Sequence, residues 1–451
     1  MKKKYLLTFP LLILFSSPLY AQAPDTLWTR TYGGDSSDVA YSLQQTTDGG
    51  YIVVGYTKSY GAGSSDVWLL KTDANGDTLW SKTFGGSALD AGYSVQQTTD
   101  GGYIIVGFTT SYGAGSQILL IKTDVNGDTT WTRTYGGAND EKGWDVEQTS
   151  DQGYIFTGTS GTTYNSRVYI VKTNANGDTL WTRRYGDYAI CYGRSIQQTY
   201  DGGYIIAGNH SDPCGDYFQI YLIKTDSLGD SIWSKIYGQP ILDRVAYSAQ
   251  ETSDHGFIIA GYTEPTASKY DVYLVRTNEI GDTLWTKSYG ESDDDRGWDV
   301  QQTSDQGYVI VGECVLSGSS KDVYIIKTDT NGDTLWTKTY GGTSNDGGYS
   351  IQQIQDSLYV IAGYTESFGA GSADAWLIEM EPDVGVEEEN IVIGKNNFGT
   401  TIISGPLRLP KGKKCKVYDI SGRSVDVNRI KPGIYFIETE GRISHKVVKI
   451  K

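Results

Sequence analysis

The chain has 451 residues, with 56 Gly, 35 Tyr and 11 Trp but only 10 Pro, and its formal net charge is −16. This composition favours an all-β globular protein over a disordered chain. The charge is uneven, since residues 22–382 contain 22 Lys and Arg against 46 Asp and Glu, whereas residues 391–451 contain 13 against 4. The acidic body argues against a nucleic-acid partner, because phosphates attract Lys and Arg. The change of sign predicts two domains joined by an acidic linker over 383–392.

The N-terminus reads MKKKYLLTFPLLILFSSPLYA. Three lysines, a short apolar run and small residues before Ala21 are typical of a secretory signal peptide. A membrane anchor is the alternative, but the apolar run is short for a bilayer and no stop-transfer pattern follows it. No later segment is long and apolar enough for a transmembrane segment. We therefore predict a signal peptide over 1–21 and a secreted or outer cell-surface location.

An internal repeat runs through the acidic body. In the first full unit, runs over 40–46, 51–57, 66–72 and 77–84 are short, apolar or alternating, and separated by Gly, Asn and Asp clusters, which predicts β-strands. Short joins predict antiparallel neighbours, and four such strands per unit are typical of a β-propeller blade. The tryptophans of the GDTLW-type segments recur every 50 to 52 residues, at Trp28, Trp80, Trp131, Trp181, Trp233, Trp285 and Trp336.

The two ends of the repeat predict how the ring closes. Seven VWLL-type strands occur, the last over 375–378, and no outer strand follows it. An unpaired outer strand, DTLWTRTY over 25–32, precedes the first unit. An open solenoid is the alternative, but it would need capping repeats with polar outer faces. We predict an all-β fold: a seven-bladed β-propeller over 22–382, closed by the N-terminal outer strand, and then a small C-terminal β-sandwich.

The repeat text carries a resemblance to known propellers. VWLLKTDANGDTLW resembles the tryptophan-docking repeats of quinoprotein propellers. In both, a glycine precedes the tryptophan by four residues, as Gly76 precedes Trp80 here. The acidic residue is one position closer and the unit is longer, so the resemblance implies the fold and not the quinone, and we predict no cofactor. Residues 25–380 more closely resemble DGGYIVVGYT-type propellers of bacterial surface proteins. The TDANGD turn carries oxygen-bearing side chains at alternate positions, as a calcium loop does. In two copies, however, Leu228 and Ile280 stand where a calcium ligand would be needed. We therefore predict a hairpin turn and no metal.

The basic module over 393–451 has its own pattern. KVYDISGR, PGIYFIE and HKVVKIK predict strands of a small β-sandwich. Tyr418-Asp419, Gly422-Arg423, Pro432-Gly433-Ile434-Tyr435 and the terminal KVVKIK resemble the type A C-terminal sorting domain of the type 9 (Por) secretion system. The resemblance implies export by the type 9 secretion machinery, removal of this domain, and release or attachment at the surface. A β-sandwich that binds a glycan or a partner is the alternative.

The sequence shows no familiar catalytic motif. His210, His255 and His445 lie in unlike contexts, and there is no nucleophile elbow, His-Glu-x-x-His, Walker loop or Cys-x-x-Cys. Most acidic residues recur in several repeats, whereas a catalytic site is one asymmetric constellation. These observations argue against an enzyme. If the chain is one, the abundant carboxylates indicate a glycoside hydrolase.

The loops indicate which face of the propeller binds. The loops over 32–38 and 58–66 share one face of a blade, and their copies vary in length and content, whereas the TTDGG and TDANGD loops of the opposite face vary little. Variable loops on a fixed scaffold commonly carry binding. Acids on this variable face form a cation-attracting ring or bond to local turn amides. They are Asp38, Asp90, Asp140, Asp243, Asp295 and Asp346.

Two repeats break the symmetry of the variable face. In the fourth, we predict a disulfide between Cys191 and Cys214, with two free thiols as the alternative. Aromatic side chains beside carboxylates suit sugars, although ordinary solvated loops have the same composition. The predicted ligand-binding residues are Asp187, Tyr188, His210, Asp212, Asp216 and Tyr217 in the fourth repeat, and Glu291, Asp293, Asp294 and Asp295 in the sixth.

These observations together predict an exported binding or adhesion module whose ligand is a glycan or a surface protein. A polysaccharide-acting, endoglucanase-like hydrolase that uses carboxylates of the variable face is one alternative. A structural surface-layer component is the other.

Overall fold

The computed structural model describes residues 24–381, with gaps at 114, 138, 163–164, 187–189, 212–216, 239–241, 267–268, 291–292, 316–319 and 356–357. Of the following residues it describes 400–403, 407, 415–419, 423–426, 430–439 and 442–449. The chain divides into two compact units, Met1–Asp383 and Val384–Lys451. Within these described ranges, no helix is long and apolar enough to span a bilayer.

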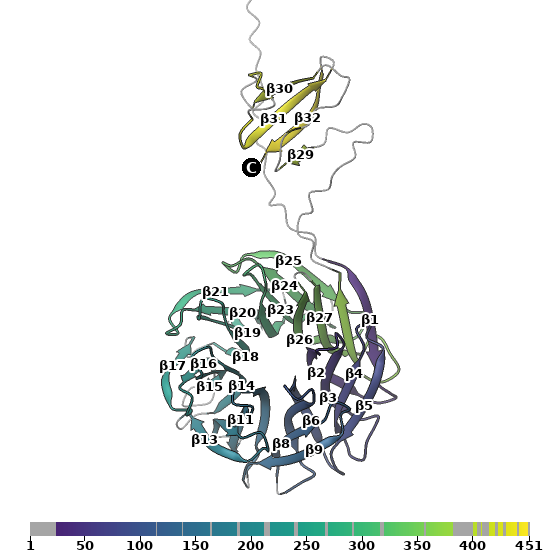
Figure 1. The fold of residues 1–451 in the computed structure, drawn as a ribbon, viewed down its shortest axis with the longest axis vertical. Helices are drawn as coiled ribbons and strands as arrows, with labels where there is room; N and C mark the ends of the chain where they lie inside the picture. Colours follow the sequence, from purple (N-terminus) through teal and green to yellow (C-terminus); the bar gives the residue numbers. More distant parts are fainter. Residues whose placement is uncertain are drawn as a thin grey trace, which may run out of the picture. The chain divides into compact units, whose positions relative to one another are not determined.

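The first unit is a ring of four-stranded antiparallel sheets, the blades of a β-propeller (Figure 1). Blade one contains β2 (Asp38–Gln45), β3 (Tyr51–Thr57), β4 (Asp66–Thr72) and β5 (Thr78–Phe84). Blades two and three contain β6 (Asp90–Gln97), β7 (Tyr103–Thr109), β8 (Gln117–Thr123) and β9 (Thr129–Tyr135), then β10 (Lys142–Gln148), β11 (Tyr154–Thr162), β12 (Asn165–Thr173) and β13 (Thr179–Tyr185). Blades four and five contain β14 (Cys191–Gln198), β15 (Tyr204–Ser211), β16 (Phe218–Thr225) and β17 (Ser231–Tyr237), then β18 (Arg244–Glu251), β19 (Phe257–Thr266), β20 (Lys269–Thr277) and β21 (Thr283–Tyr289). Blade six contains β22 (Asp295–Gln302), β23 (Tyr308–Val315), β24 (Lys321–Thr328) and β25 (Thr334–Tyr340).

Blade seven joins the two ends of the propeller. Its inner strands are β26 (Asp346–Gln355), β27 (Leu358–Thr365) and β28 (Asp374–Met380), and its outer strand is β1 (Thr26–Tyr32) from the start of the chain. The β1–β28 ladder runs antiparallel and pairs Thr29 with Ile378 and Tyr32 with Ala375. The predicted closure and the count of seven blades are therefore confirmed. Closing the ring also covers β28, which would otherwise be an exposed sheet edge.

The hydrophobic core lies between neighbouring blades. Ile52 on β3 and Leu69 on β4 belong to one buried cluster with Val95, Tyr103 and Ile105 of blade two. Because neighbours cover both faces of every blade, β3 and β4 are buried along nearly their whole length. This explains why these runs are apolar on both faces instead of alternating. Burying each such side chain stabilises the fold by about 1.5 to 3 kcal/mol.

A pair of Gln or Glu residues near the end of each inner strand links the blades around the channel. The Gln44 side-chain oxygen accepts a hydrogen bond from the Gln97 amide of blade two at 2.6 Å, and the Gln352 oxygen returns to the Gln45 amide of blade one at 2.6 Å. The same bond joins every neighbouring pair of blades. We call its acceptors the glutamine ring; they are Gln44, Gln96, Glu147, Gln197, Gln250, Gln301 and Gln352.

The TDANGD turns have a structural explanation. Asp73 Oδ1 accepts hydrogen bonds from the amides of Asn75 and Asp77 at 2.8 and 2.9 Å, which closes the turn. The following glycine has positive φ and lies against the tryptophan of the preceding blade: a Cβ on Gly127 (φ +76°) would lie 2.6 Å from the Trp80 ring. Gly and the next Asp therefore recur because they hold neighbouring blades together at the outer edge. The predicted hairpin is confirmed.

The C-terminal unit contains one four-stranded sheet among its described residues. Its strands are β29 (Thr400–Ile403), β30 (Cys415–Asp419), β31 (Gly433–Thr439) and β32 (Arg442–Lys449), in the order β29-β32-β31-β30. Val417, Tyr435 and Ile437 are in its core. Asp419 accepts a hydrogen bond from the Arg423 amide at 3.0 Å, so the Tyr-Asp and Gly-Arg pairs of the sequence bracket a tight turn. The three strands predicted from the sequence are all present.

Candidate binding site at the mouth of the channel

Every inner strand has a β-bulge at the same position, as at the register shift between Ala40 and Ser42. A bulge turns a side chain away from the regular alternation of a strand. The residue before it is small, because a Cβ on Gly92 would lie 2.5 Å from Val54 of blade one. The seven bulged residues line the channel and are here called the girdle; they are Tyr41, Tyr93, Trp144, Arg194, Tyr247, Trp298 and Tyr349.

The girdle is a continuous ring of side chains. Neighbouring aromatic centroids lie 4.3 to 5.5 Å apart. Arg194 fills the remaining gap, with its guanidinium carbon 4.1 Å from the centre of Trp144 and 5.4 Å from that of Tyr247. All seven side chains are partly buried, so each keeps some surface toward the channel. Burial raises the pKa of Tyr93 to about 12, and this phenol therefore remains a neutral hydrogen-bond donor.

A second layer lies directly next to the girdle, formed by Ser42, Ser94, Asp145, Ser195, Ser248, Asp299 and Ser350. Asp145 accepts hydrogen bonds from Ser94 Oγ and the Ile196 amide, both at 2.8 Å, and so links blades two, three and four. Burial raises the pKa of Asp145 to about 6. Asp299 links blades five, six and seven in the same way, through Ser248 Oγ and the Ile351 amide. The girdle and this layer enclose about 160 Å³.

Further aromatic side chains lie beside the girdle toward the variable face. Phe108 stacks on Tyr93 with centroids 5.8 Å apart, and Tyr364 stacks on Tyr349 at 5.7 Å. Cations lie over this group, with Lys142 Nζ 4.8 Å from the centre of Phe108. The mouth of the channel is thus aromatic, with Lys142 and Arg194 lying against its rings.

Most acids of the predicted ring on the variable face accept hydrogen bonds within their own loops. Asp38 is fully buried, and its carboxylate accepts hydrogen bonds from the Gly34 amide at 2.8 Å, from Ser59 Oγ at 2.6 Å and from Thr57 Oγ1. Asp90 and Asp346 are buried in equivalent positions. In blade three the buried acid is Glu141 and not Asp140, which is exposed. Local bonding, the alternative to a cation-attracting ring, describes these acids.

The residues predicted in blade four are only partly within the described ranges. His210 on β15 pairs in register with Cys191 on β14, and its ring packs edge-on against Tyr221 at 5.5 Å. Cys191 is fully buried, and Tyr217 is 36% exposed before β16. Asp187, Tyr188, Asp212, Cys214 and Asp216 lie outside the described residues. The predicted Cys191–Cys214 disulfide therefore stays a prediction.

The residues predicted in blade six point to different partners. Asp293 lies 3.8 Å from Lys269 Nζ, and Asp294 accepts a hydrogen bond from the Tyr270 amide at 3.2 Å. Asp295 is buried at the start of β22. Glu291 lies outside the described residues. Blade five lies between blades four and six in the ring.

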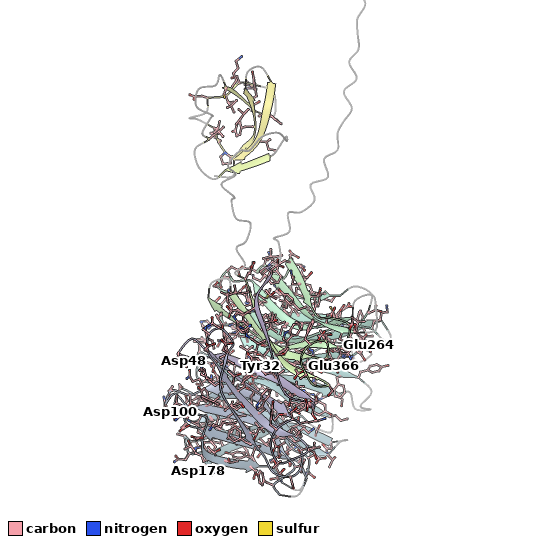
Figure 2. All side chains as sticks on the ribbon, turned by 90° about the vertical axis from the view of Figure 1, so that its right-hand side faces the viewer. Tyr32, Asp48, Asp100, Asp178, Glu264 and Glu366 are labelled. Atoms are coloured by element: carbon pink, nitrogen blue, oxygen red, sulfur yellow. The ribbon has the colours of Figure 1, made fainter. Side chains whose placement is uncertain are left out.

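The two faces of the propeller differ in how their charges are used. Figure 2 shows Asp48 and Asp100 on one side of the propeller and Glu264 and Glu366 on the variable side. On the side of Asp48, the carboxylate of that residue pairs with the buried ammonium of Lys71 at 3.0 Å. Five of the first six blades carry such a Lys–Asp pair, and blade five carries Arg276 with Asp254.

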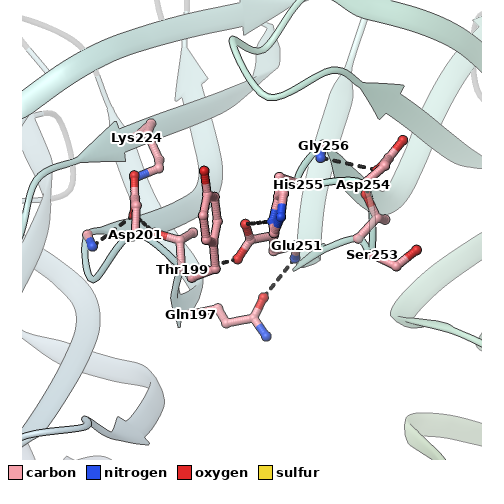
Figure 3. A network of polar contacts seen from close by, with 12 residues as sticks. Gln197, Thr199, Asp201, Lys224, Glu251, Ser253, Asp254, His255 and Gly256 are labelled. Carbon is pink, nitrogen blue, oxygen red and sulfur yellow. Dashed lines mark hydrogen bonds and ion pairs between the residues drawn. The ribbon is translucent and has the colours of Figure 1, made fainter.

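Figure 3 shows this opposite face where blades four and five meet. Asp201 pairs with Lys224 at 2.8 Å, and Glu251 contacts His255 Nδ1 at 3.2 Å. Glu251 also donates its amide hydrogen to the Gln197 side chain of the glutamine ring at 2.7 Å. The Glu251–Gln197 bond joins the two blades, whereas the Asp201–Lys224 and Glu251–His255 contacts each lie within one blade.

The girdle was not singled out from the sequence, although a signal for it exists. Four repeats carry Tyr-Ser before the glutamines, whereas the third and sixth carry Trp-Asp and the fourth carries Arg-Ser. These departures fall at one position of an otherwise regular repeat. The sequence alone does not show that a bulge turns the side chain at this position into the channel.

Comparisons with known proteins find similarity to solved structures alone. No model of a protein family and no curated protein matches it. A protein of unknown function from Dyadobacter fermentans DSM 18053 is 12% identical, with a TM-score of 0.46, and the match covers 79% of this chain and 98% of that chain. The Neurospora crassa Pan2 WD40 domain is 9% identical, with a TM-score of 0.47 and coverages of 80% and 96%. Chaetomium thermophilum Sqt1, bound to the N-terminus of ribosomal protein L10, is 8% identical, with a TM-score of 0.46 and coverages of 79% and 100%.

Proposed function

We propose that this protein is an exported binding module that holds a glycan at the girdle, on the variable face of its propeller. The observation that carries this proposal is the closed ring of partly exposed aromatic side chains around the channel. Aromatic faces stack on the apolar faces of sugar rings, and phenol hydroxyls can bond to sugar hydroxyls. The second group of aromatic side chains, which includes Phe108 and Tyr364, extends this surface outward.

Export is the second part of the proposal. It is supported by the signal-peptide pattern over 1–21 and by the resemblance of 393–451 to the type A sorting domain of the type 9 secretion system. The propeller would then act at the cell surface or in the medium, where glycans and surface proteins are abundant. Deleting 393–451 should leave the propeller in the periplasm of a bacterium that has the type 9 machinery. Equal surface display with and without this segment would count against export by that route.

The binding part is tested on a glycan array with the chain purified without residues 1–21. Trp144→Ala should remove the signal, whereas Trp144→Tyr restores the side chain of four other blades and should keep most of it. Tyr60→Ala is the matched control, because Tyr60 is 48% exposed on the same face but outside the girdle. Binding that survives Trp144→Ala unchanged would place the ligand elsewhere. Release of reducing ends from the bound glycan would favour the hydrolase alternative instead.

A further inference from the structure

Arg194 is the one member of the girdle that is not aromatic. Its guanidinium lies over the rings of Trp144, Tyr192 and Tyr247, at 4.1, 5.3 and 5.4 Å from their centres. Contacts with ring faces stabilise the positive charge but leave the N–H groups of the guanidinium without acceptors. The side chain is therefore held in place by its neighbours while most of its hydrogen-bonding capacity is unused.

The donors of Arg194 have no recorded acceptor among the described residues. Its Nε is buried without a hydrogen-bond partner, and no carboxylate of the described chain forms an ion pair with it. The buried cations of the opposite face differ, since the five lysines there each contact an aspartate at 2.7 to 3.0 Å. A partly buried guanidinium without a counter-ion gains stability when a ligand supplies the missing negative charge.

The negative groups next to Arg194 are already occupied. Both oxygens of Asp145 accept protein hydrogen bonds, from Ser94 and Val146 on one side and from Ile196 on the other. Asp299 on the far side of the channel has the equivalent set of donors. These carboxylates hold blades together, and neither is recorded in an ion pair with the guanidinium. The anion that Arg194 lacks has to come from outside the described chain.

The space beside Arg194 limits the size of what can bind. The open pocket between the girdle and the Ser/Asp layer holds about 160 Å³, which is room for about one sugar ring. Trp144 and Tyr247 flank the guanidinium, so a sugar ring that packs against their channel-facing surface brings a substituent to the N–H groups. A guanidinium binds a carboxylate with two parallel hydrogen bonds, which a neutral hydroxymethyl group cannot form.

Resting on the proposed function, we infer that the ligand is an acidic sugar residue whose carboxylate binds Arg194 while its ring stacks on the aromatic side chains of the girdle. This inference names the ligand class of the same site. It also assigns Arg194 as the residue that selects uronic acids over their neutral counterparts. The ligand source is a glycan that carries such a residue, and the free acidic sugar is the minimal form of the same chemistry.

The test measures binding by calorimetry with the full chain purified without residues 1–21. The probes are glucuronate and galacturonate, free and at the end of oligosaccharides, with glucose and galactose as their neutral counterparts. Arg194→Tyr places the side chain of four other blades in the girdle, and it should lower affinity for the acidic sugars about tenfold or more. Affinity for neutral sugars should change by less than about threefold.

Two further variants separate the carboxylate contact from general effects. Arg194→Lys keeps the charge but not the two parallel donors, so it should recover only part of the affinity. Arg183→Lys is the control, because Arg183 on the outer strand of blade three pairs with Asp230 of blade four, away from the girdle, and other blades carry Lys there. This variant should bind like the wild type.

Each outcome decides a different point. Loss of acidic-sugar binding in Arg194→Tyr, with the control unchanged, supports the inference. Equal affinity for acidic and neutral sugars in the wild type, unaffected by Arg194→Tyr, overturns it and leaves the proposed glycan binding intact. If neither class of sugar binds the wild type, the proposed function itself fails.

Discussion

Glu147 is the one acid in the glutamine ring, and the other six blades provide its natural control. Its carboxylate accepts a hydrogen bond from the Gln198 amide, as each glutamine does from the next blade. Burial, and the charge of nearby Asp145, raise the pKa of Glu147 to about 7 from an ordinary value of 4.5. Glu147→Gln keeps the acceptor oxygen and removes the titration.

The sign and size of the effect follow from proton linkage. Between the ordinary pKa and the raised pKa, Glu147 is protonated in the folded chain but ionised in the unfolded chain. The free energy of unfolding therefore falls as the pH rises from about 4 to about 7. The shift of roughly 2.5 units corresponds to up to about 3 kcal/mol. Aspartates with lowered pKa, such as Asp48 at about 2, act in the opposite direction at lower pH, and the comparison with Glu147→Gln removes their contribution.

Urea unfolding followed by tryptophan fluorescence measures this difference. Wild type and Glu147→Gln should have similar free energies of unfolding near pH 4, and the variant should be more stable by up to about 3 kcal/mol near pH 8. Asp145→Ser in the wild-type background should reduce the pH dependence and move it to lower pH, because it removes the raised pKa of Asp145 itself and a charge that adds to burial in raising the Glu147 pKa. Identical pH dependence in wild type and Glu147→Gln would refute the reasoning.

Three further outcomes are expected. Gly127→Ala should destabilise the propeller by about 2 to 4 kcal/mol, because Gly127 has positive φ and lies against Trp80. Gly101 also has positive φ but lies in open space, so Gly101→Ala should lower stability by only about 1 kcal/mol. Equal losses in chemical denaturation would contradict the role given to the Trp80 contact. Removing residues 24–32 should expose β28 as a sheet edge and cause aggregation visible by light scattering, and a monodisperse product would argue against closure by β1. Asp145→Ser, the residue of five other blades, should strengthen binding of an acidic sugar by removing a negative group from the cavity of Arg194, and weaker binding would contradict the electrostatic argument.

The fold could be predicted almost completely because the same pattern of strands and turns occurs in all seven repeats. Turn glycines, two-sided apolar runs and the orphan strand over 25–32 each have one simple explanation in a closed ring, and β1 pairs with β28 as expected. The candidate site was harder to predict, for a physical reason. Loop composition at Asp293 to Asp295 looks like a binding surface, yet Asp294 bonds to a backbone amide and Asp295 is buried. Side-chain direction at a bulge depends on backbone geometry, which periodicity does not encode.

The repeat also shows which channel residues the fold does not need. Four blades are built with Tyr in the girdle, five with Ser in the next layer and six with Gln in the glutamine ring, so these neutral residues suffice for packing and for the bonds between blades. Arg194, Asp145, Asp299 and Glu147 replace them with ionisable groups inside a narrow channel, where burial opposes the charged forms. Asp145, Asp299 and Glu147 recover part of this loss through amide bonds, but Arg194 has no acceptor within the described chain. Ring contacts offset part of the cost for Arg194 but leave its donors unused, and departures from local rules of this kind are expected at functional sites. By this criterion, Arg194 is the channel residue that most clearly indicates a ligand site.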